Sequence, residues 1–218
     1  MNSFFDKLAA KWNEDKFICV GLDKGDFAFD KQIIDQTFDL VCAYKPNSAF
    51  YEAEGTTGLN TLKETISYIH QKDSNIPVIL DAKRGDIGNT NEAYAKAIFD
   101  DLAADAVTVS PYLGQESLQP FLKRTDKGII VLVRTSNPGA GEFQDLVIEG
   151  KPLYQVVAEH VKDWNINGNL AVVVGATYPE ELRWVRQACP DMPLLIPGIG
   201  PQGGDLEKAV RYSVDGQG

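Results

Sequence analysis

Seven short apolar runs, separated by segments with helical periodicity, constrain the fold more than any other feature of this chain. Most of the runs are continuously hydrophobic rather than alternating, which is typical of strands buried on both faces and therefore of a parallel sheet. The predicted strands are residues 17–23, 40–47, 76–83, 105–110, 128–136, 170–176 and 192–200.

Helical patterns occupy the segments between the predicted strands. One repeats leucine and isoleucine at spacings of three and four residues, one opens with Asn89 and Thr90 as candidate N-caps, and two open with or next to a proline. An alternation of strands and helices is typical of a doubly wound sheet or of a (β/α)8 barrel. The helical patterns cover residues 3–12, 59–69, 89–104, 152–164 and 179–188.

Polar residues at the carboxyl ends of the predicted strands distinguish these two folds. In a barrel all these ends meet on one face, where active sites lie, whereas a doubly wound sheet concentrates its ligand groups at one crevice. Nearly every strand here ends in such residues, which favours the barrel. They are Asp23, Lys45, Asn47, Asp81, Lys83, Ser110, Arg134, Ser136, Thr177, Gly198 and Gly200.

We therefore predict an α/β fold of the (β/α)8 TIM-barrel class, formed by one domain over residues 1–218. Neither a linker nor a low-complexity tract divides the sequence, and its length suits one domain. A complete barrel has eight strands. We accordingly expect the eighth strand and the last helix to be absent from this chain, and the domain to be C-terminally incomplete.

The overall charge limits the partners. A net charge of −10 argues against nucleic acids and anionic membranes, although a local cluster of cations can still hold a small anion. No apolar run approaches the roughly 20 residues of a membrane span, and the N-terminus lacks a signal peptide's apolar centre, so we expect a cytoplasmic protein. Three dispersed cysteines and two distant histidines indicate core and helix-surface positions rather than a metal site.

The stretch "DAKRGDIGNT", residues 81–90, places several charges directly behind the apolar run "PVIL". Asp81 and Lys83 are two residues apart and point to the same side of a strand, Asp86 adds a second carboxylate, and Lys45 from an earlier strand can reach them. Such an array can keep a lysine charged as a proton donor beside a carboxylate that repels another anion. From the charges alone, a purely structural ion-pair cluster is an equal alternative. Arg84 has the opposite parity and is expected to be solvated or to contact a helix.

"DAKRGDIGNT" resembles the D-x-K-x-x-D-I-x-x-T signature of the orotidine 5′-phosphate decarboxylase family, in the form found in its bacterial type 2 branch. "VGLD", "AYKPNSAFYEAEG", "VRTSNPGAGEFQ" and "PGIGPQGGD" resemble further blocks of that family in the same order. The resemblance extends from about Phe17 to Asp205. The combination of blocks is specific, whereas each block alone would be weak.

The resemblance implies the decarboxylation of orotidine 5′-monophosphate to UMP and CO2, the last step of de novo pyrimidine nucleotide synthesis. It implies no metal and no organic cofactor, and a homodimer of barrels with sites at the subunit interface. Lys83 would protonate C6 of the pyrimidine and stabilise the carbanion left by CO2. Asp81 would lie beside the substrate carboxylate, and Lys45 would order the array and touch the ribose.

The resemblance also implies a set of binding residues. Asp86, Ile87 and Thr90 would reach the site of the neighbouring subunit, Asp23 would bind a ribose hydroxyl, and Ser136 would bond the pyrimidine edge. The family's phosphate-binding arginine follows its eighth strand, so Arg211 is not assigned that role. The residues expected to close over the phosphate are Gly200, Gln202 and Gly203.

Two alternative functions remain open. Magnesium-dependent sugar-phosphate lyases and decarboxylases of the same suprafamily share the D-x-K-x-x-D strand and need an additional acidic ligand, for which Glu52 or Glu54 could serve. A non-catalytic nucleotide-binding barrel is the other alternative. The "TSNPG" block argues against the first, and the intact set of Lys45, Asp81, Lys83 and Asp86 argues against the second.

Overall fold

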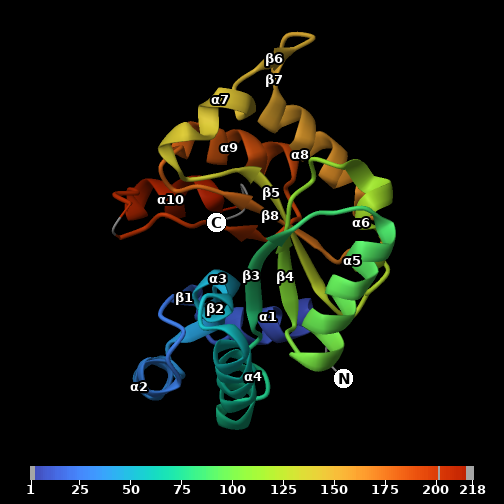
Figure 1. Cartoon of the computed structure of the whole chain (residues 1–218). Coiled ribbons are helices and arrows are strands. Elements are labelled where there is room, and N and C mark those ends of the chain that lie inside the picture. The colour runs from blue at the N-terminus through green and yellow to red at the C-terminus, as the bar shows by residue number, and fades with distance from the viewer. Residues whose placement is uncertain (1–2, 201, 215–218) are drawn as a thin grey trace. The chain divides into compact units, whose positions relative to one another are not determined.

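The structure of the protein is a computed structural model that describes residues 3–200 and 202–214 (Figure 1). The chain divides into two compact units, residues 1–129 and 130–218, and each is described by itself. The single-domain organisation stays a prediction. The end of the sequence, residues 215–218, lies outside the described residues, and the last described helix is α10.

The first unit alternates strands and helices, as predicted. β1 pairs in parallel with β2, and β3 pairs in parallel with β4. Isolated bridges from Tyr44 to Val78 and from Asn47 to Asp81 join the end of β2 to the region of β3. The elements are α1 (Phe4–Trp12), β1 (Ile18–Leu22), α2 (Phe27–Thr37), β2 (Val41–Pro46), α3 (Ser48–Glu52), α4 (Gly55–Lys72), β3 (Ile79–Arg84), α5 (Gly88–Ala95), a π-helical turn (Lys96–Asp101), β4 (Ala106–Val109) and α6 (Gly114–Leu122).

The second unit continues this alternation after β5 (Gly128–Arg134), which runs across the boundary between the units. β8 and β9 pair in parallel, whereas β6 and β7 form an antiparallel hairpin that was not predicted. The remaining elements are a 3-10 turn (Pro138–Ala140), α7 (Gly141–Gln144), β6 (Val147–Ile148), β7 (Lys151–Pro152), α8 (Leu153–Trp164), β8 (Leu170–Val174), α9 (Pro179–Ala188), β9 (Leu194–Leu195) and α10 (Leu206–Ser213).

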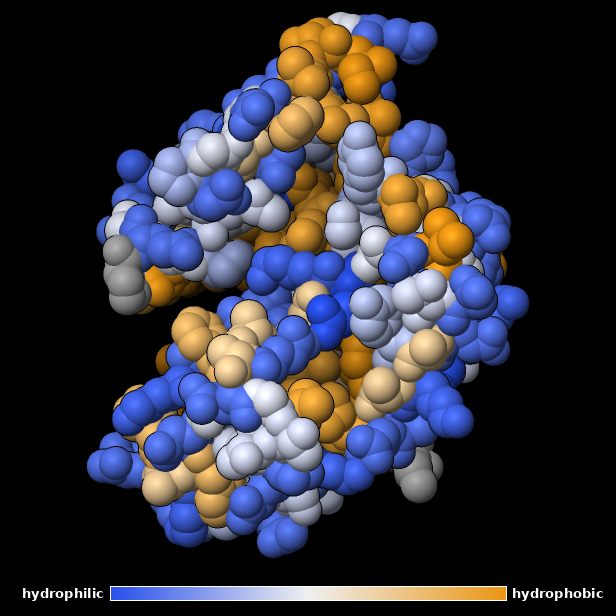
Figure 2. All heavy atoms as spheres, in the orientation of Figure 1, coloured by the Kyte–Doolittle hydropathy of each residue, from blue (hydrophilic) through white to orange (hydrophobic). Residues whose placement is uncertain are grey.

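All seven predicted strands are therefore confirmed in their predicted places. Burial on both faces is confirmed for β4 and β8, every residue of which is buried, but not for β1, where Ile18 is 62% exposed. Apolar side chains are also exposed on α7 and the β6–β7 hairpin, where Figure 2 shows an orange patch at the top. Continuous hydrophobicity thus located the strands correctly and predicted the burial of β4 and β8, but not that of β1.

Several local predictions can be compared with the helices. The prolines are where expected: Pro152 is the N-cap of α8, and Pro179 is the first residue of α9. The N-cap prediction for residues 89–104 is wrong, because Ile87 is the N-cap of α5 and both Asn89 and Thr90 lie inside the helix. The reason is the preceding loop, where side-chain bonds of Asp86 and Asn91 fix the chain before the helix starts.

The cysteines and histidines are more varied than predicted. Cys42 and Cys189 are buried, as expected, whereas Cys19 keeps part of its surface exposed. The surface role predicted for His70 is wrong, because its Nε2 lies 2.8 Å from the buried carboxylate of Asp105. His160 stacks on Trp164 one helical turn away. In the part of the chain that the structure describes, no helix is long and apolar enough to cross a membrane.

Candidate active site

β3 and the end of the neighbouring β2 bring together three of the four residues predicted to form the charged array. One carboxylate oxygen of Asp81 lies 3.1 Å from Nζ of Lys45, and the other lies 2.7 Å from Nζ of Lys83. Lys45 comes from β2, and the bridge from Asn47 to Asp81 places the ends of β2 and β3 side by side. The predicted Lys-Asp-Lys contact is thus present within one chain.

Burial and charge act together on these groups. Burial disfavours the charge on Lys45, but the nearby Asp81 and Asp23 outweigh it and hold the pKa of Lys45 above its ordinary value. Burial also opposes the charge on Asp81, yet Lys45, Lys83 and the Thr108 hydroxyl keep its pKa below its ordinary value. The two groups therefore stabilise each other's ionised forms. Lys83 differs in exposure, since its side chain is 50% exposed while that of Asp81 is 11% exposed.

Asp23 lies after the end of β1 and is exposed. Its charge contributes to the raised pKa of Lys45, which places it in the same electrostatic neighbourhood. Cys19, also on β1, lies near the same groups, and burial, opposed by the positive charge of Lys45, raises the pKa of its thiol to about 12. The cysteine is therefore a neutral neighbour of the array rather than a nucleophile.

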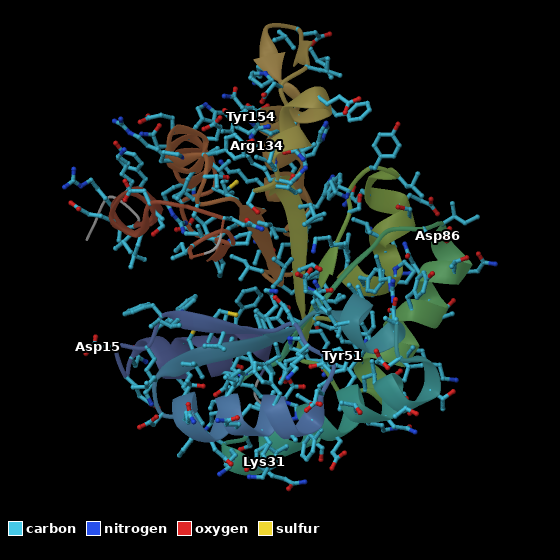
Figure 3. All side chains as sticks on the ribbon, turned by 60° about the vertical axis from the view of Figure 1, so that its left-hand side comes forward. Asp15, Lys31, Tyr51, Asp86, Arg134 and Tyr154 are labelled. Atoms are coloured by element: carbon cyan, nitrogen blue, oxygen red, sulfur yellow. The ribbon has the colours of Figure 1, made fainter. Side chains whose placement is uncertain are left out.

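Among the interactions of the described residues, none joins Asp86 to the other three members of the array. The carboxylate of Asp86 accepts a bond from the N–H of Ile87 at 2.7 Å, and its backbone is held at both ends by the amide of Asn91. Asn91 is fully buried and also donates to the carbonyl of Ser117 at 2.7 Å. Asp86 itself lies in the loop that precedes α5 (Figure 3). Ile87 is 62% exposed and Thr90 is partly exposed.

In the second unit, Ser136 and the loop after β9 come together. A Cβ atom placed on Gly198 would lie 3.2 Å from Cβ of Ser136 and 2.9 Å from Oε1 of Gln202, so both side chains crowd this glycine. The carbonyl of Ser136 accepts a bond from the Thr177 hydroxyl at 3.2 Å. Ser136 and Gln202, predicted on different grounds to contact one ligand, are therefore neighbours.

The predicted phosphate loop needs its glycines for its shape. Gly198, Gly200 and Gly203 have φ values of +100°, +101° and +78°, a region that other residues rarely adopt. The N–H of Gly203 is bonded to the carbonyl of Gly200 at 2.9 Å, and that of Gly204 to the carbonyl of Gly198 at 2.9 Å. Gly203 thus supports the turn with its own N–H.

Arg134 is the last residue of β5, at a strand end as predicted, but its side chain is buried. Its side chain is 2% exposed, lies 3.9 Å from the ring centre of Tyr178 and 2.9 Å from a carboxylate oxygen of Asp145. The guanidinium also lies 5.7 Å from the ring centre of Tyr154, and the two residues are labelled next to each other in Figure 3. Because an arginine cannot lose its charge, burial is tolerated only with such partners. Through Asp145 and Tyr178, the side chain joins the segment that follows β5 to the residue before α9.

Two residues that touch the predicted site were not singled out in the sequence. The hydroxyl of Thr108 bonds to Asp81 at 2.9 Å, and Asn91 holds Asp86. A threonine amid valines in a buried strand, next to the charged strand in sequence order, is a signal that could have identified Thr108. Asn91 offers no comparable signal. Arg84 was expected either to be solvated or to contact a helix. The second expectation is confirmed, because Arg84 pairs with Glu52 of α3.

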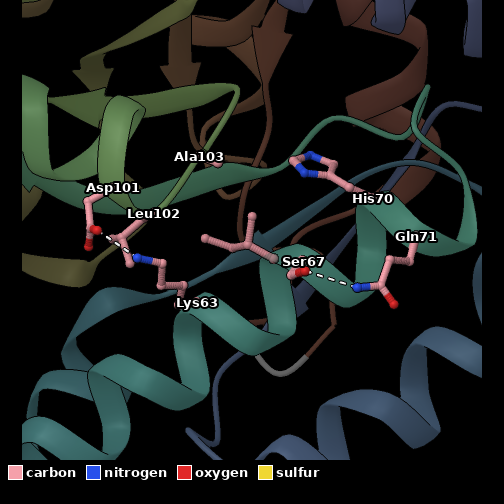
Figure 4. A pocket seen from close by; sticks show the side chains of 8 residues that line it. Lys63, Ser67, His70, Gln71, Asp101, Leu102 and Ala103 are labelled. Atoms are coloured by element: carbon pink, nitrogen blue, oxygen red, sulfur yellow. Dashed lines mark hydrogen bonds and ion pairs between the residues drawn. The ribbon is translucent and has the colours of Figure 1, made fainter.

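A separate pocket of about 390 Å³ lies between α4 and the π-helical turn (Figure 4). Its polar residues are largely engaged with one another, since Lys63 pairs with Asp101 and Gln71 bonds to Ser67. Its lining includes none of the residues predicted for the site. This pocket is therefore distinct from the charged strand end.

Comparison with known proteins identifies the class. Residues 16–217 match the model of the orotidine 5′-phosphate decarboxylase/HUMPS family. The orotidine 5′-phosphate decarboxylase of Roseiflexus castenholzii is 48% identical over 98% of this chain and 84% of its own length. The chain belongs to the orotidine 5′-phosphate decarboxylase/HUMPS family.

Solved structures agree with this assignment. The structure of Leishmania donovani OMP decarboxylase has a TM-score of 0.92 and 41% identity, over 98% of this chain and 85% of that one. That of Methanocaldococcus jannaschii orotidine 5′-monophosphate decarboxylase, complexed with the inhibitor BMP, has a TM-score of 0.74 and 28% identity, over 92% and 85%. The chain spans 48% of the longer Leishmania donovani UMP synthase. These likenesses confirm the predicted fold class, the (β/α)8 TIM barrel.

Proposed function

We propose that the protein decarboxylates orotidine 5′-monophosphate to UMP and CO2 in pyrimidine nucleotide synthesis, without a metal or an organic cofactor. The observation that carries the proposal is the contact of Lys45, Asp81 and Lys83 at the end of β3, in a chain 48% identical to an orotidine 5′-phosphate decarboxylase. A cytoplasmic location belongs to the same proposal.

The array supplies both a negative charge and a proton. The carboxylate of Asp81, kept ionised by its lysine neighbours, would disfavour a second carboxylate placed beside it. When the bond between C6 and the carboxylate carbon breaks, its electron pair stays on C6, and the ammonium of Lys83 stabilises that charge. The proton of Nζ then moves to C6, and the lysine regains a proton from solvent. The half-exposed side chain of Lys83 suits this exchange.

The binding roles belong to the proposal as well. Lys45 and Asp23 would contact the ribose, which is consistent with the effect of the Asp23 charge on Lys45. Ser136 would bond the pyrimidine edge, and its neighbour Gln202, with Gly200 and Gly203, would close over the phosphate. The N–H of Gly203 already donates to the carbonyl of Gly200. We therefore assign Gly203 the role of shaping the loop rather than that of a hydrogen-bond donor to the phosphate.

A homodimer would supply the fourth charge of the array. Asp86 bonds to its own neighbour Ile87 and, among the interactions of the described residues, is not joined to Lys83. Ile87, 62% exposed, lies next to it on the surface. We therefore propose that Asp86, Ile87 and Thr90 reach the site of a second copy of the chain.

The magnesium-dependent alternative is weakened by one contact. Glu52, a candidate for the additional metal ligand, is paired with the guanidinium of Arg84, which also lies 4.8 Å from the ring centre of Tyr94. A cation would have to displace this partner. Glu54 lies at the start of α4 and is exposed.

The direct test follows the absorbance loss of orotidine 5′-monophosphate with the purified protein in excess EDTA. We expect turnover that is unchanged by the chelator. Activity that disappears in EDTA and returns with Mg²⁺ would support the metal-dependent alternative. Binding of UMP without turnover would support the non-catalytic alternative and overturn the proposal.

The dimer is tested by mixing two inactive variants, Asp86→Ala and Lys83→Ala. If sites are shared, a mixed dimer has one site with both residues intact, so random exchange should restore about a quarter of the wild-type activity. Subunit exchange is checked by mass spectrometry of differently labelled chains. Confirmed exchange with no recovery of activity would contradict the shared site.

A further inference from the structure

The strand that carries Asp81 and Lys83 is irregular at these residues. β3 and β4 pair with Leu80 opposite Val107 and Arg84 opposite Val109, so three residues of β3 face a single residue of β4. Such a bulge interrupts the ladder of backbone bonds and changes the direction of the side chains on it. The single residue opposite the bulge is Thr108.

The hydroxyl of Thr108 replaces the missing backbone partners. Its Oγ1 accepts the N–H groups of Ala82 and Lys83, both at 3.0 Å, and it lies 2.9 Å from Oδ1 of Asp81. A hydroxyl has two acceptor positions and one proton. Because the two N–H groups occupy both acceptor positions, its proton must point to Asp81. The Thr108 hydroxyl therefore makes all three of its hydrogen bonds, accepting two and donating one.

This arrangement fixes the charged form of Asp81. The carboxylate receives Thr108 and Lys83 on Oδ1 and Lys45 on Oδ2. A hydroxyl that can only donate favours the ionised carboxylate over the protonated one. Thr108 is 1% exposed, so water cannot take its place without rearrangement of the strand.

The same hydroxyl holds the backbone of Lys83 in an unusual conformation. Lys83 has a φ of +45°, in the left-handed region that residues other than glycine rarely occupy. Backbone strain of this kind persists only where surrounding bonds impose it. The bond from the N–H of Lys83 to Thr108 is one such bond, and the ion pair from Nζ to Asp81 is another.

We propose that Thr108 is a positioning residue, whose hydroxyl sets the orientation of Asp81 and the backbone of Lys83 and thereby places the Lys83 ammonium. This inference rests on the proposed decarboxylase function. It assigns no contact with substrate to Thr108, which acts through its two neighbours on β3.

The test compares Thr108→Val, which keeps the shape and removes the hydroxyl, with Thr108→Ser, which keeps the hydroxyl. For Thr108→Val we expect kcat to fall about 10- to 100-fold, the effect of losing one hydrogen bond to a charged group, with KM changed less than about threefold. Thr108→Ser should stay within about threefold of wild type. The acidic limb of the pH–rate profile should move to higher pH in the valine variant, because Asp81 loses a donor that favours its charge.

Thr65→Val is the matched control for a merely structural effect. The Thr65 hydroxyl is fully buried and donates to the carboxylate of Asp30 at 3.0 Å, in the same unit but outside the array. Both valine variants should lower the melting temperature by a similar amount, whereas only Thr108→Val should lower kcat. Equal kcat values in the two valine variants at matched folded fraction would overturn the proposal.

Crystal structures of the Thr108 variants provide a readout that does not depend on activity. In Thr108→Val we expect Lys83 to leave the left-handed region and its ammonium to separate from Asp81, whereas Thr108→Ser should keep both. An unchanged φ and ion pair in the valine variant would contradict the positioning role. If the wild-type protein does not turn over orotidine 5′-monophosphate but the bulge relaxes as expected, the proposed function fails while the structural role of Thr108 stands.

Discussion

Asp81 and Asp105, two buried carboxylates of the first unit, have nearly the same surroundings. Their side chains are 11% and 10% exposed, and each is bonded to two basic residues. Asp105 lies 2.6 Å from Nζ of Lys7 and 2.8 Å from Nε2 of His70, and it also accepts the N–H of Val78. For Asp105, as for Asp81, burial opposes the charge but the basic partners keep the pKa below its ordinary value.

The two clusters differ in their position along the strands and in the exposure of their basic side chains. Asp105 precedes β4 and joins α1, through Lys7, to the last turn of α4, through His70. Asp81 lies within β3, and its partner Lys83, next to the last residue of that strand, is half exposed on a strained backbone. In barrels the carboxyl ends of strands carry active sites, and the amino ends carry stability. The pattern of charges alone therefore does not separate function from structure, whereas strand end and exposure do.

The largest effect should distinguish Lys83 of the Asp81 cluster from Lys7 of the Asp105 cluster. We expect Lys83→Ala to lower kcat about 10⁴-fold or more, because it removes both the proton donor and the charge that stabilises the carbanion. Its melting temperature should change little, since exposed ion pairs contribute about 0–1 kcal/mol. Steady-state kinetics and thermal unfolding measure both.

Lys7→Ala is the control for this comparison. It removes a cation from the Asp105 cluster, so it should lower the melting temperature while keeping kcat close to wild type at temperatures where the variant is folded. A Lys83→Ala variant with a near-normal rate would contradict the assignment of the proton donor. A Lys7→Ala variant with a large loss of kcat would remove the contrast between the clusters.

A smaller effect should appear in the stability of Asp105→Ala. The change leaves Lys7 and His70 without their carboxylate and the N–H of Val78 without its acceptor, which should cost about 3 kcal/mol or a fall in Tm of about 6–12 °C. The pKa of Asp105 is lowered in the folded state, so its stabilisation is present above the ordinary value near 3.8 and is lost as the pH falls through the folded pKa.

Urea unfolding between pH 7 and pH 3 measures this prediction. The free energies of unfolding of the wild type and of Asp105→Ala should differ fully near neutral pH and converge in acid. A difference that stayed constant with pH would indicate lost packing rather than a lost ionised contact.

Strand positions could be predicted from the sequence because burial imposes continuous hydrophobicity on a short run. The bulge in β3 could not, because it depends on how Leu80 and Arg84 pair with β4 and on one hydroxyl of Thr108. The β6–β7 hairpin is also too short, at two residues a strand, for any periodicity to show. Sequence patterns thus predict the elements, while the register between them decides the local geometry.

The residues of the candidate site divide in the same way. Lys45, Asp81 and Lys83 were predicted because charges behind an apolar strand are costly and need a reason. Asn91 was missed because a buried asparagine that bonds to Asp86 and Ser117 has the same sequence context as one at a helix start. His70 was assigned to the surface because its partner, Asp105, is 35 residues away in the chain. Contacts between distant residues account for both errors.

The smallest effect should come from Asp30, a buried carboxylate bonded to hydroxyls rather than to cations. Burial raises its pKa above the ordinary value, and the hydroxyls of Tyr51 and Thr65 offset this only in part. The folded chain therefore binds this proton more readily than the unfolded chain, so Asp30 contributes more stability as the pH falls, opposite in sign to Asp105. Asp30→Asn removes the titration and keeps an oxygen that can accept both hydroxyls.

We expect Asp30→Asn to change the free energy of unfolding at pH 7 by about 1 kcal/mol or less. Its amide nitrogen replaces Oδ1, a buried atom that has no hydrogen-bond partner among the described residues. Just above the ordinary carboxyl pKa near 3.8, where the raised pKa of Asp30 acts, the variant should lose part of the pH dependence of the wild type. Asp15→Asn is the control, because Asp15 is exposed at a φ of +58° that asparagine tolerates (Figure 3). An Asp30→Asn profile parallel to that of the wild type would mean that Asp30 stays ionised throughout, and that hydroxyl donors alone can hold a buried carboxylate charged as effectively as the lysines hold Asp81.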